Sequence, residues 1–428
     1  MESIPMKTHY KICINSKTSF QWDSSILFYI AIGAFYINSI VGLTTLMDIG
    51  AVSALMKIFR WIGYIFCILK ICTQTYTLRS IFKIIVTAGI VFLSSYLSGY
   101  QTLLIWLLYI LAAQNIDLRK TAKEVMIITL VLFLLVVLLA ELGFIESTTQ
   151  SVSSSSRSYL WSSGNTILLW GFEHHNYIGR CAFTFITCYI FLRFDKFKWF
   201  DLIPCVIVFY ICYFVSKTRT AALLILAATL LVLFFKLLKF FGEKTNKNIV
   251  AFTVYFIMIL SIAFSIFMCL TYNSGSAFYE FFDDLLTTRF SSANSIFSNY
   301  GFSILGQDVT LVSTIEAKEQ GITAIVLDNA YMHLLIRFGL LLSALVIGGY
   351  FYSAKIALRE KNYGILIIIA IIFVCGIAEA WFFSLSSNPF LLLVSTGLYN
   401  QDLKLEKSAT ERKKRIKLTW KKSSILKG

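Results

Sequence analysis

A histidine pair beside a carboxylate is the first group in this sequence with residue types suited to chemistry. Glu173, His174 and His175 are consecutive, and Asn176 ends the polar segment. Imidazole is a common general base near neutral pH, so His174 is the first candidate base and Glu173 is an alternative. The histidines could instead be structural, and ligands on one short stretch are insufficient evidence for a metal site.

Basic residues close to this segment indicate a site for an anion. Arg180 lies one turn into an apolar stretch, Lys217 and Arg219 connect two apolar stretches, and Arg157 and Arg289 lie in long polar segments. A guanidinium group binds two phosphate oxygens at once. We therefore interpret these residues as candidates for binding a diphosphate. The alternative is that they extend from the membrane toward its aqueous surface.

Two further polar groups occur late in the chain. Asp328 and Asn329 precede an apolar stretch, and Tyr331 follows them closely. An Asp-Asn pair at the start of a helix is either an N-cap or part of a binding site, and both interpretations remain open. Glu379 lies deep in another apolar stretch, where a carboxylate is costly and is therefore a functional candidate. Asp328 and Glu379 are additional candidates for the base.

The segments that must position these residues are strongly apolar. Of the 428 residues 57% are hydrophobic and only 14% charged, whereas soluble domains are about one quarter charged. A helix needs roughly 20 apolar residues to cross a bilayer, and such stretches recur along the whole chain. We predict an all-α polytopic membrane protein with about 12 transmembrane helices. The predicted spans are 25–43, 56–72, 82–98, 102–115, 125–145, 176–193, 200–216, 220–237, 249–271, 333–353, 364–385 and 388–400.

The distribution of lysine and arginine predicts the orientation of these spans. With the N-terminus inside, 29 of the 38 basic residues fall in cytoplasmic segments, as expected from the positive-inside rule. We predict a cytoplasmic N-terminal segment at 1–24, a single membrane domain at 25–400 and a basic cytoplasmic tail at 401–428. Two long extracytoplasmic loops are predicted, at about 146–175 and 272–332.

Charge and cysteine content argue against two other classes of protein. The net charge of +15 could suggest nucleic-acid binding, but in a membrane protein excess basic residues mark the cytoplasmic side and contact anionic lipid. Eight of the nine cysteines lie in apolar stretches, without a CxxC pair or a cysteine–histidine cluster. We interpret them as packing residues, and expect neither a cofactor nor nucleic acid as a partner.

In their order along the chain, the polar segments resemble those of the Wzy-type O-antigen and capsular polysaccharide polymerases, in the O-antigen ligase/polymerase-like membrane superfamily. The resemblance covers roughly 150–395. Arg157 and Arg289 depart from the Arg-to-Gly spacing of some members. The matching segments are Gly171–Asn176, with His175 where members frequently have proline, Ser216–Thr220, Arg289 ahead of Leu305-Gly306, Asp328–Tyr331 and Glu379.

The resemblance implies glycosyl transfer on the outer face of the cytoplasmic membrane. Donor and acceptor would be glycans on a polyprenyl diphosphate such as undecaprenyl diphosphate, and the product a capsule, exopolysaccharide or O-antigen. Arginines would stabilise the departing diphosphate, so that no obligatory metal is expected. A flippase and a chain-length regulator would be partners. The implied site comprises His174, Glu173, Asp328 and Glu379 as candidates for catalysis and Arg180, Lys217, Arg219, Arg289, Arg157, Asn176, Asn329 and Tyr331 for substrate binding.

Three other functions fit parts of the pattern. Ligases of the same superfamily, which move a finished glycan to a different acceptor, usually carry histidine two residues before the asparagine, where this chain has Leu327. A flippase or transporter for lipid-linked oligosaccharides fits twelve spans with intramembrane charges, but the two long outer loops fit it less well. A sensor or scaffold has little support, because no soluble domain is recognisable.

Overall fold

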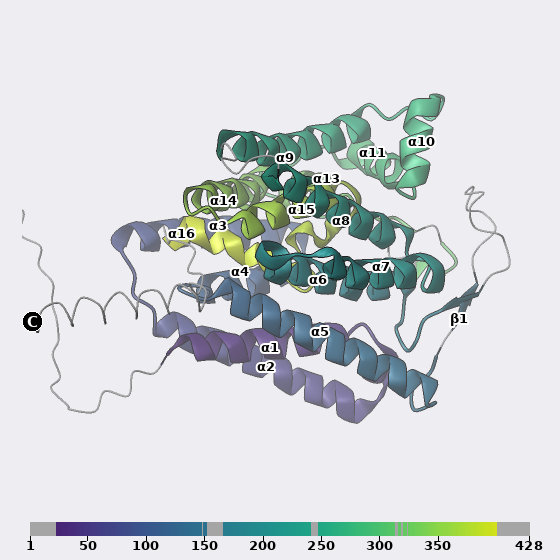
Figure 1. The fold of residues 1–428 in the computed structure, drawn as a ribbon, viewed down its shortest axis with the longest axis horizontal. Coiled ribbons are helices and arrows are strands. Elements are labelled where there is room, and N and C mark those ends of the chain that lie inside the picture. The colour runs from purple at the N-terminus through teal and green to yellow at the C-terminus, as the bar shows by residue number, and fades with distance from the viewer. Residues whose placement is uncertain are drawn as a thin grey trace, which may run out of the picture.

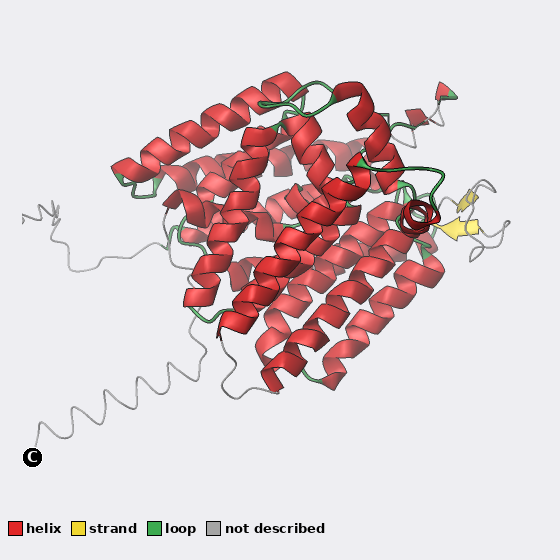
Figure 2. Cartoon of the chain, turned by 90° about the horizontal axis from the view of Figure 1, so that it is seen from above, coloured by secondary structure: helices red, strands yellow, loops and turns green. Residues whose placement is uncertain are grey.

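The structure, a computed structural model, is a bundle of roughly parallel helices (Figures 1 and 2). It describes residues 23–147, 149–151, 166–240, 247–312, 316–317, 320–322 and 324–399. Its helices and strands are α1 (Ser25–Val41), α2 (Gly50–Cys72), α3 (Leu78–Ser98), α4 (Thr102–Ala112), α5 (Leu118–Glu141), β1 (Thr149–Ser151), β2 (Thr166–Leu168), α6 (His175–Arg193), α7 (Leu202–Tyr210), α8 (Arg219–Phe240), α9 (Lys247–Leu270), α10 (Ala277–Leu285), α11 (Arg289–Tyr300), α13 (Ala330–Met332), α14 (Leu340–Arg359), α15 (Tyr363–Ala378) and α16 (Ser395–Tyr399).

The prediction of a multi-pass membrane protein is confirmed by helix length and hydropathy. Within the described residues, seven helices are long and apolar enough to cross a membrane. Five shorter apolar helices complete the set, and each of the twelve predicted spans overlaps one of these elements. The shorter ones are Ser25–Val41, Thr102–Ala112, Trp199–Val215, Tyr363–Ala378 and Pro389–Tyr399.

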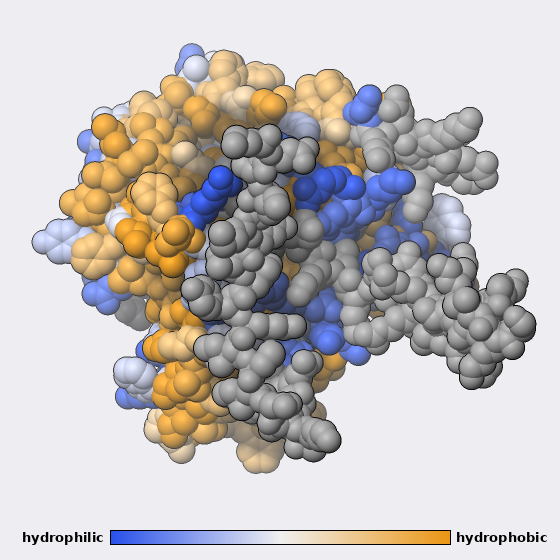
Figure 3. Space-filling model, turned by 90° about the vertical axis from the view of Figure 1, so that its left-hand side faces the viewer, coloured by the Kyte–Doolittle hydropathy of each residue, from blue (hydrophilic) through white to orange (hydrophobic). Residues whose placement is uncertain are grey.

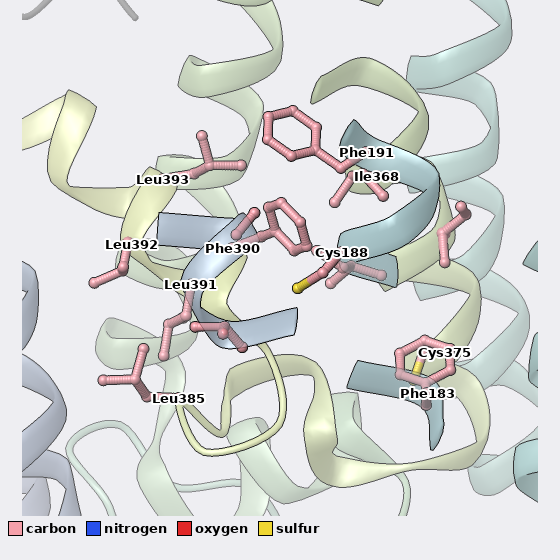
Figure 4. Packing of buried hydrophobic residues seen from close by; sticks show 14 of the residues in the cluster. Phe183, Cys188, Phe191, Ile368, Cys375, Leu385, Phe390, Leu391, Leu392 and Leu393 are labelled. Atoms are coloured by element: carbon pink, nitrogen blue, oxygen red, sulfur yellow. The ribbon is translucent and has the colours of Figure 1, made fainter. Parts of the chain in front are cut away.

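The apolar helices differ in what surrounds them. In the most apolar stretches of α2, α3 and α5, only 17 to 22% of the residues are buried inside the protein, which is the pattern of helices that face lipid. Nearly all of α15 is buried, as expected for a helix that is apolar on every side. Figure 4 shows part of the core around it, where Ile368 and Cys375 of α15 lie among side chains such as Cys188 and Phe191 of α6 and Phe390.

The cysteines behave as packing residues. All eight that the structure describes are free, and all except Cys72 are buried. Cys188, for example, lies in the apolar cluster of Figure 4. Cys13 lies outside the described residues.

The late spans differ from the prediction in their boundaries. The span predicted at 333–353 starts too early, because His333–Phe338 forms a π-helical turn and α14 begins only after Gly339. Gly339 has a φ of 90°, which breaks the helix because only glycine adopts this conformation readily. In the span predicted at 364–385 the helix ends earlier than predicted, because α15 stops at Ala378.

The two long loops contain secondary structure that the sequence did not predict. β1 and β2 pair antiparallel within the first loop, a small exception to the all-α prediction. The second loop contains α10, α11 and α13. In Figure 1 β1, α10 and α11 lie toward the same end of the bundle, which we call the site end.

The opposite end of the bundle is also polar. Figure 3 looks onto it and shows hydrophilic residues in the middle of the face, bordered by hydrophobic residues. Arg193, at the last turn of α6, pairs there with Asp201 at 2.8 Å, and Arg119 at the start of α5 pairs with Asp195. Charged groups at both ends and apolar side chains between them are what a membrane-spanning bundle requires.

Candidate functional site

Arg289 is the centre of a buried ion-pair cluster. It is the first residue of α11, and only 9% of it is exposed. Its Nη2 donates a hydrogen bond to Oε1 of Glu379 at 2.8 Å, and its Nη1 forms an ion pair with Oδ2 of Asp328. Three residues predicted from separate polar segments therefore meet at one point. Glu379 is buried, whereas a third of the Asp328 side chain is exposed.

The first turn of α11, which begins with Arg289, is fixed by a carboxylate that sequence reasoning missed. Oδ1 of the buried Asp283 accepts hydrogen bonds from the backbone N–H groups of Phe290 at 2.9 Å and Ser291 at 3.0 Å. The turn between Asp283 and Arg289 contains Thr287 and Thr288, with φ values of 55° and 63°. Only the acidic residues that precede Arg289 could have signalled this role. Asp283 thus caps α11 and positions the guanidinium.

We expect Asp283→Ala to loosen Arg289 while the bundle stays folded. Loss of a capping side chain costs about 1 kcal/mol, and the freed α11 N-terminus would no longer hold Arg289 between its carboxylates. Thermal unfolding in detergent and activity in membranes are the measurements. Asp284→Ala is the matched control, because Asp284 is the exposed neighbour. Equal activity of the two variants would contradict the positioning role.

A second guanidinium group, that of Arg180, lies near the carboxylate of Glu379. Nε of Arg180, in α6, donates to Oγ of Ser387 at 2.7 Å, and its Nη2 donates to Oγ of Ser386 at 2.6 Å. The charges of Arg180 and Glu379 are close enough to interact. The serine run was not recognised in the sequence, although a hydroxyl-rich turn after an apolar helix is a visible signal. Serine hydroxyls hold Arg180 without neutralising its charge.

The histidine pair lies at the start of α6, facing the same cluster. Nδ1 of His174 accepts a hydrogen bond from the backbone N–H of Asn176 at 3.2 Å, so neutral His174 carries its proton on Nε2. Burial lowers the pKa of His174, which favours this neutral form. The rings of His174 and His175 are 4.2 Å apart, and the charge of Arg289 reaches His175. In this tautomer His174 donates a proton more readily than it accepts one.

Glu173 lies at the edge of the site rather than within it. Its side chain is exposed, and its backbone N–H donates to the carbonyl of Leu43. Partial burial and the nearby carboxylate of Asp48 raise the pKa of Glu173. The ion pairs of Arg289 are formed by Asp328 and Glu379, whereas Glu173 is tied to the segment that follows α1.

Lys217 and Arg219 lie on the connection that packs against the start of α6. Arg219 begins α8, and a Cβ built on Gly179 of α6 would lie 2.7 Å from Cβ of Ala221. The glycine therefore permits a close approach of α8 to α6, one residue before Arg180. Lys217 and Arg219 are partly exposed. Thr218 and Ala221, which are next to these cations in the chain, thus pack on α6 at Gly179.

Strained backbone precedes three helices that carry site residues. Among the described residues six non-glycine positions have a positive φ, and four of them are Trp170, Lys217, Thr287 and Thr288. Trp170 precedes α6, Lys217 precedes α8 and the two threonines precede α11. Such conformations cost about 1–3 kcal/mol each and cluster at functional sites. Their placement supports the choice of this end of the bundle as the site.

Asn329 and Tyr331 have structural partners. Asn329 is fully buried; its Nδ2 donates to Oγ of Ser265 at 2.6 Å and to the carbonyl of Ile377 at 2.8 Å, and its Oδ1 caps α13 at the N–H of Met332. The phenol of Tyr331 donates to a backbone carbonyl of α15 at 2.6 Å. The N-cap interpretation of Asn329 is confirmed, and both residues attach the segment after Asp328 to α9 and α15.

Asn329→Ala is expected to prevent stable folding. The change leaves the Ser265 hydroxyl and the Ile377 carbonyl without this partner, and each unsatisfied buried group costs about 1–3 kcal/mol. The amount of protein extracted in a monodisperse state and its thermal unfolding temperature are the measurements. Asn294→Ala is the control, since partly buried Asn294 donates one such bond, to the carbonyl of Cys269. Similar yields for both variants would show that Asn329 is not needed for the fold.

His333, which begins the π-helical turn after α13, is a further polar residue that sequence reasoning did not select. Its Nδ1 is 2.9 Å from the carbonyl oxygen of Leu327, which only accepts hydrogen bonds, so Nδ1 carries the proton. Nε2 is buried without a partner in the described structure, and the ring packs on Phe383. A lone histidine four residues after Asn329 was the available signal. Arg157, the remaining predicted residue, lies outside the described residues.

The site thus combines two guanidinium groups, two carboxylates and a histidine pair at one end of a membrane bundle. Arg289 is compensated by carboxylates, and Arg180 is bound by hydroxyl groups. Guanidinium groups in such an arrangement can bind an anion. In comparisons with known proteins, no family model, no curated protein and no solved structure matches this chain.

Proposed function

We propose that the protein polymerises oligosaccharide repeat units carried on a polyprenyl diphosphate, on the extracytoplasmic side of the cytoplasmic membrane. The observation that supports this most is the meeting of Arg289, Asp328 and Glu379 beside Arg180 at one end of an apolar bundle. A lipid-linked substrate places its diphosphate at the membrane surface, where this cluster lies at the ends of spanning helices.

Arg180 is the residue best placed to bind the diphosphate in this proposal. Its partners are neutral serine hydroxyls, which a phosphate oxygen can replace or join. Lys217 and Arg219 supply further positive charge from the start of α8. Charge-assisted hydrogen bonds to phosphate are roughly twice as strong as neutral ones, and stabilising the leaving diphosphate lowers the barrier to glycosyl transfer.

Asp328 is the proposed base. One of its oxygens pairs with Arg289, and the side chain is partly exposed, so an acceptor hydroxyl can approach it. The hydroxyl oxygen attacks the anomeric carbon of the donor glycan, the bond from that carbon to the diphosphate oxygen breaks, and Asp328 takes the hydroxyl proton. Polyprenyl diphosphate leaves with the bonding electrons. Arg289, which is itself bound by Glu379, holds Asp328 in place for this step.

The size of the surface glycan in cells that lack the chain tests the proposal. A polymerase-deficient cell should display single repeat units outside, while the ladder of longer glycans disappears and returns with the wild-type chain. Single units trapped on the cytoplasmic leaflet would indicate a flippase instead. Long polymer retained on the lipid carrier would indicate a ligase. An unchanged ladder in the deleted strain would refute the proposed function.

A further inference from the structure

An apolar groove of about 300 Å³ lies between α5, α6 and α7, which run side by side in Figure 1. Its wall is formed by α5, the first half of α6, and α7 with its π-helical continuation from Ile211. Apart from Thr129 and Cys181, all lining side chains are hydrocarbon. The groove therefore suits a hydrocarbon chain and not a sugar or a phosphate.

The groove opens toward the surroundings of the bundle. Leu134 of α5 and Ile207 of α7, both in its wall, are 57% and 53% exposed. In a membrane-spanning bundle, exposed apolar side chains at this depth face lipid chains. A chain can therefore enter the groove sideways from the bilayer.

One end of the groove lies next to the cations of the candidate site. Cys181 lines the groove and directly follows Arg180. On the other wall, Ile211 begins the π-helical turn that leads to Lys217 and Arg219. The lining of α7 runs from Pro204 to Ile211, about 10 Å along a helix. A lipid tail in the groove would bring its anionic head group toward this end of the bundle, where α6 carries Arg180 and the connection to α8 carries Lys217 and Arg219.

We propose that this groove holds the isoprene units nearest the diphosphate of the lipid-linked substrate. The proposal rests on the proposed function for the identity of the lipid. Leaving lipid for an apolar groove gives little hydrophobic gain, because the two surroundings are equally apolar. The groove acts by orientation: a fixed tail aligns the diphosphate with Arg180 and the anomeric carbon with Asp328, and such alignment accelerates a bimolecular reaction.

Photolabelling of the purified full-length protein in lipid nanodiscs tests the groove directly. The probe is geranylgeranyl diphosphate with a diazirine on its first isoprene unit, and labelled peptides are mapped by mass spectrometry. We expect labels in α5, α6 and α7. Unlabelled geranylgeranyl diphosphate should compete, whereas an equal excess of phosphatidylglycerol should not. Equal competition by phosphatidylglycerol, or labelling elsewhere, would overturn the proposal, since the groove would then hold any lipid or none.

Filling the groove provides the second measurement. Ala182→Phe and Val208→Phe each place a ring in it from a different helix, and labelling should fall at least five-fold in both. Ala263→Phe is the control, because Ala263 is exposed on α9, away from this wall. Thermal unfolding confirms that each variant is folded. Unchanged labelling in either folded variant would contradict the proposal.

The outcome for the groove is distinguishable from the outcome for the proposed function. If deletion collapses the ladder but Ala182→Phe and Val208→Phe keep full labelling, the polymerase stands and the groove assignment fails. If labelling is specific and lost in both variants but deletion leaves the ladder unchanged, the protein binds an isoprenoid diphosphate without polymerising it. That result refutes the proposed function and with it the role of the groove in polymerisation.

Discussion

Arg289→Ala is expected to collapse the glycan ladder to single repeat units. The substitution leaves the carboxylates of Asp328 and Glu379 close together without the guanidinium between them. Removing one partner of a buried ion pair costs about 3–5 kcal/mol, and the like charges then disfavour ionised Asp328, which the proposed mechanism requires as the base. We expect activity to fall at least 100-fold, measured as ladder length in membranes with equal amounts of protein.

A lysine at the same position separates the geometry of Arg289 from its charge. Arg289→Lys keeps the cation, but one ammonium group cannot reproduce the two separate contacts of Nη1 and Nη2. We expect a folded protein with a shortened ladder. Arg60→Ala is the control, since Arg60 is an exposed basic residue on α2. Arg219→Ala should also shorten the ladder. Normal ladders in the Arg289 and Arg219 variants would remove the basis of the site assignment.

Gly339→Ala is expected to abolish the folded protein. Gly339 has a φ of 90°, and a Cβ there would lie 2.5 Å from the backbone nitrogen of Gly306 and 2.7 Å from the carbonyl oxygen of Ile304. Backbone atoms cannot move aside as a flexible side chain does, and L-residues with this φ are strained. Extracted monodisperse protein and its thermal unfolding temperature are the measurements.

The control for this change is in the following helix. Gly348 is in α14, and a Cβ built there meets nothing within 4 Å. Gly348→Ala should therefore leave the protein as stable as before or slightly more stable, because alanine favours helix over glycine by about 1 kcal/mol. A stable Gly339→Ala protein would mean that the loop after α11 does not pack against the start of α14. That packing includes hydrogen bonds from Leu340 to Ser303 and from Gln307 to Arg337.

The sequence alone determined that this is a multi-pass membrane protein and which residues are unusual within it. Apolar runs report helix length directly, because every backbone polar group in lipid must be satisfied within its own segment. Charged residues in or beside such runs are costly, so Arg180 and Glu379 could be selected from position alone. Asn329 could likewise be recognised as a helix cap, although the sequence left a binding role open.

Only the tertiary structure decided which of these residues meet and which helices lie inside. Arg289 and Glu379 are 90 residues apart in the chain, and no local pattern encodes that pairing. The apolar runs of α5 and α15 look alike in sequence, yet one faces the surroundings and the other is buried, because lipid and protein interior are equally apolar. The caps and supports of the site, Asp283 and the serines that hold Arg180, depend on contacts formed only when distant segments pack together.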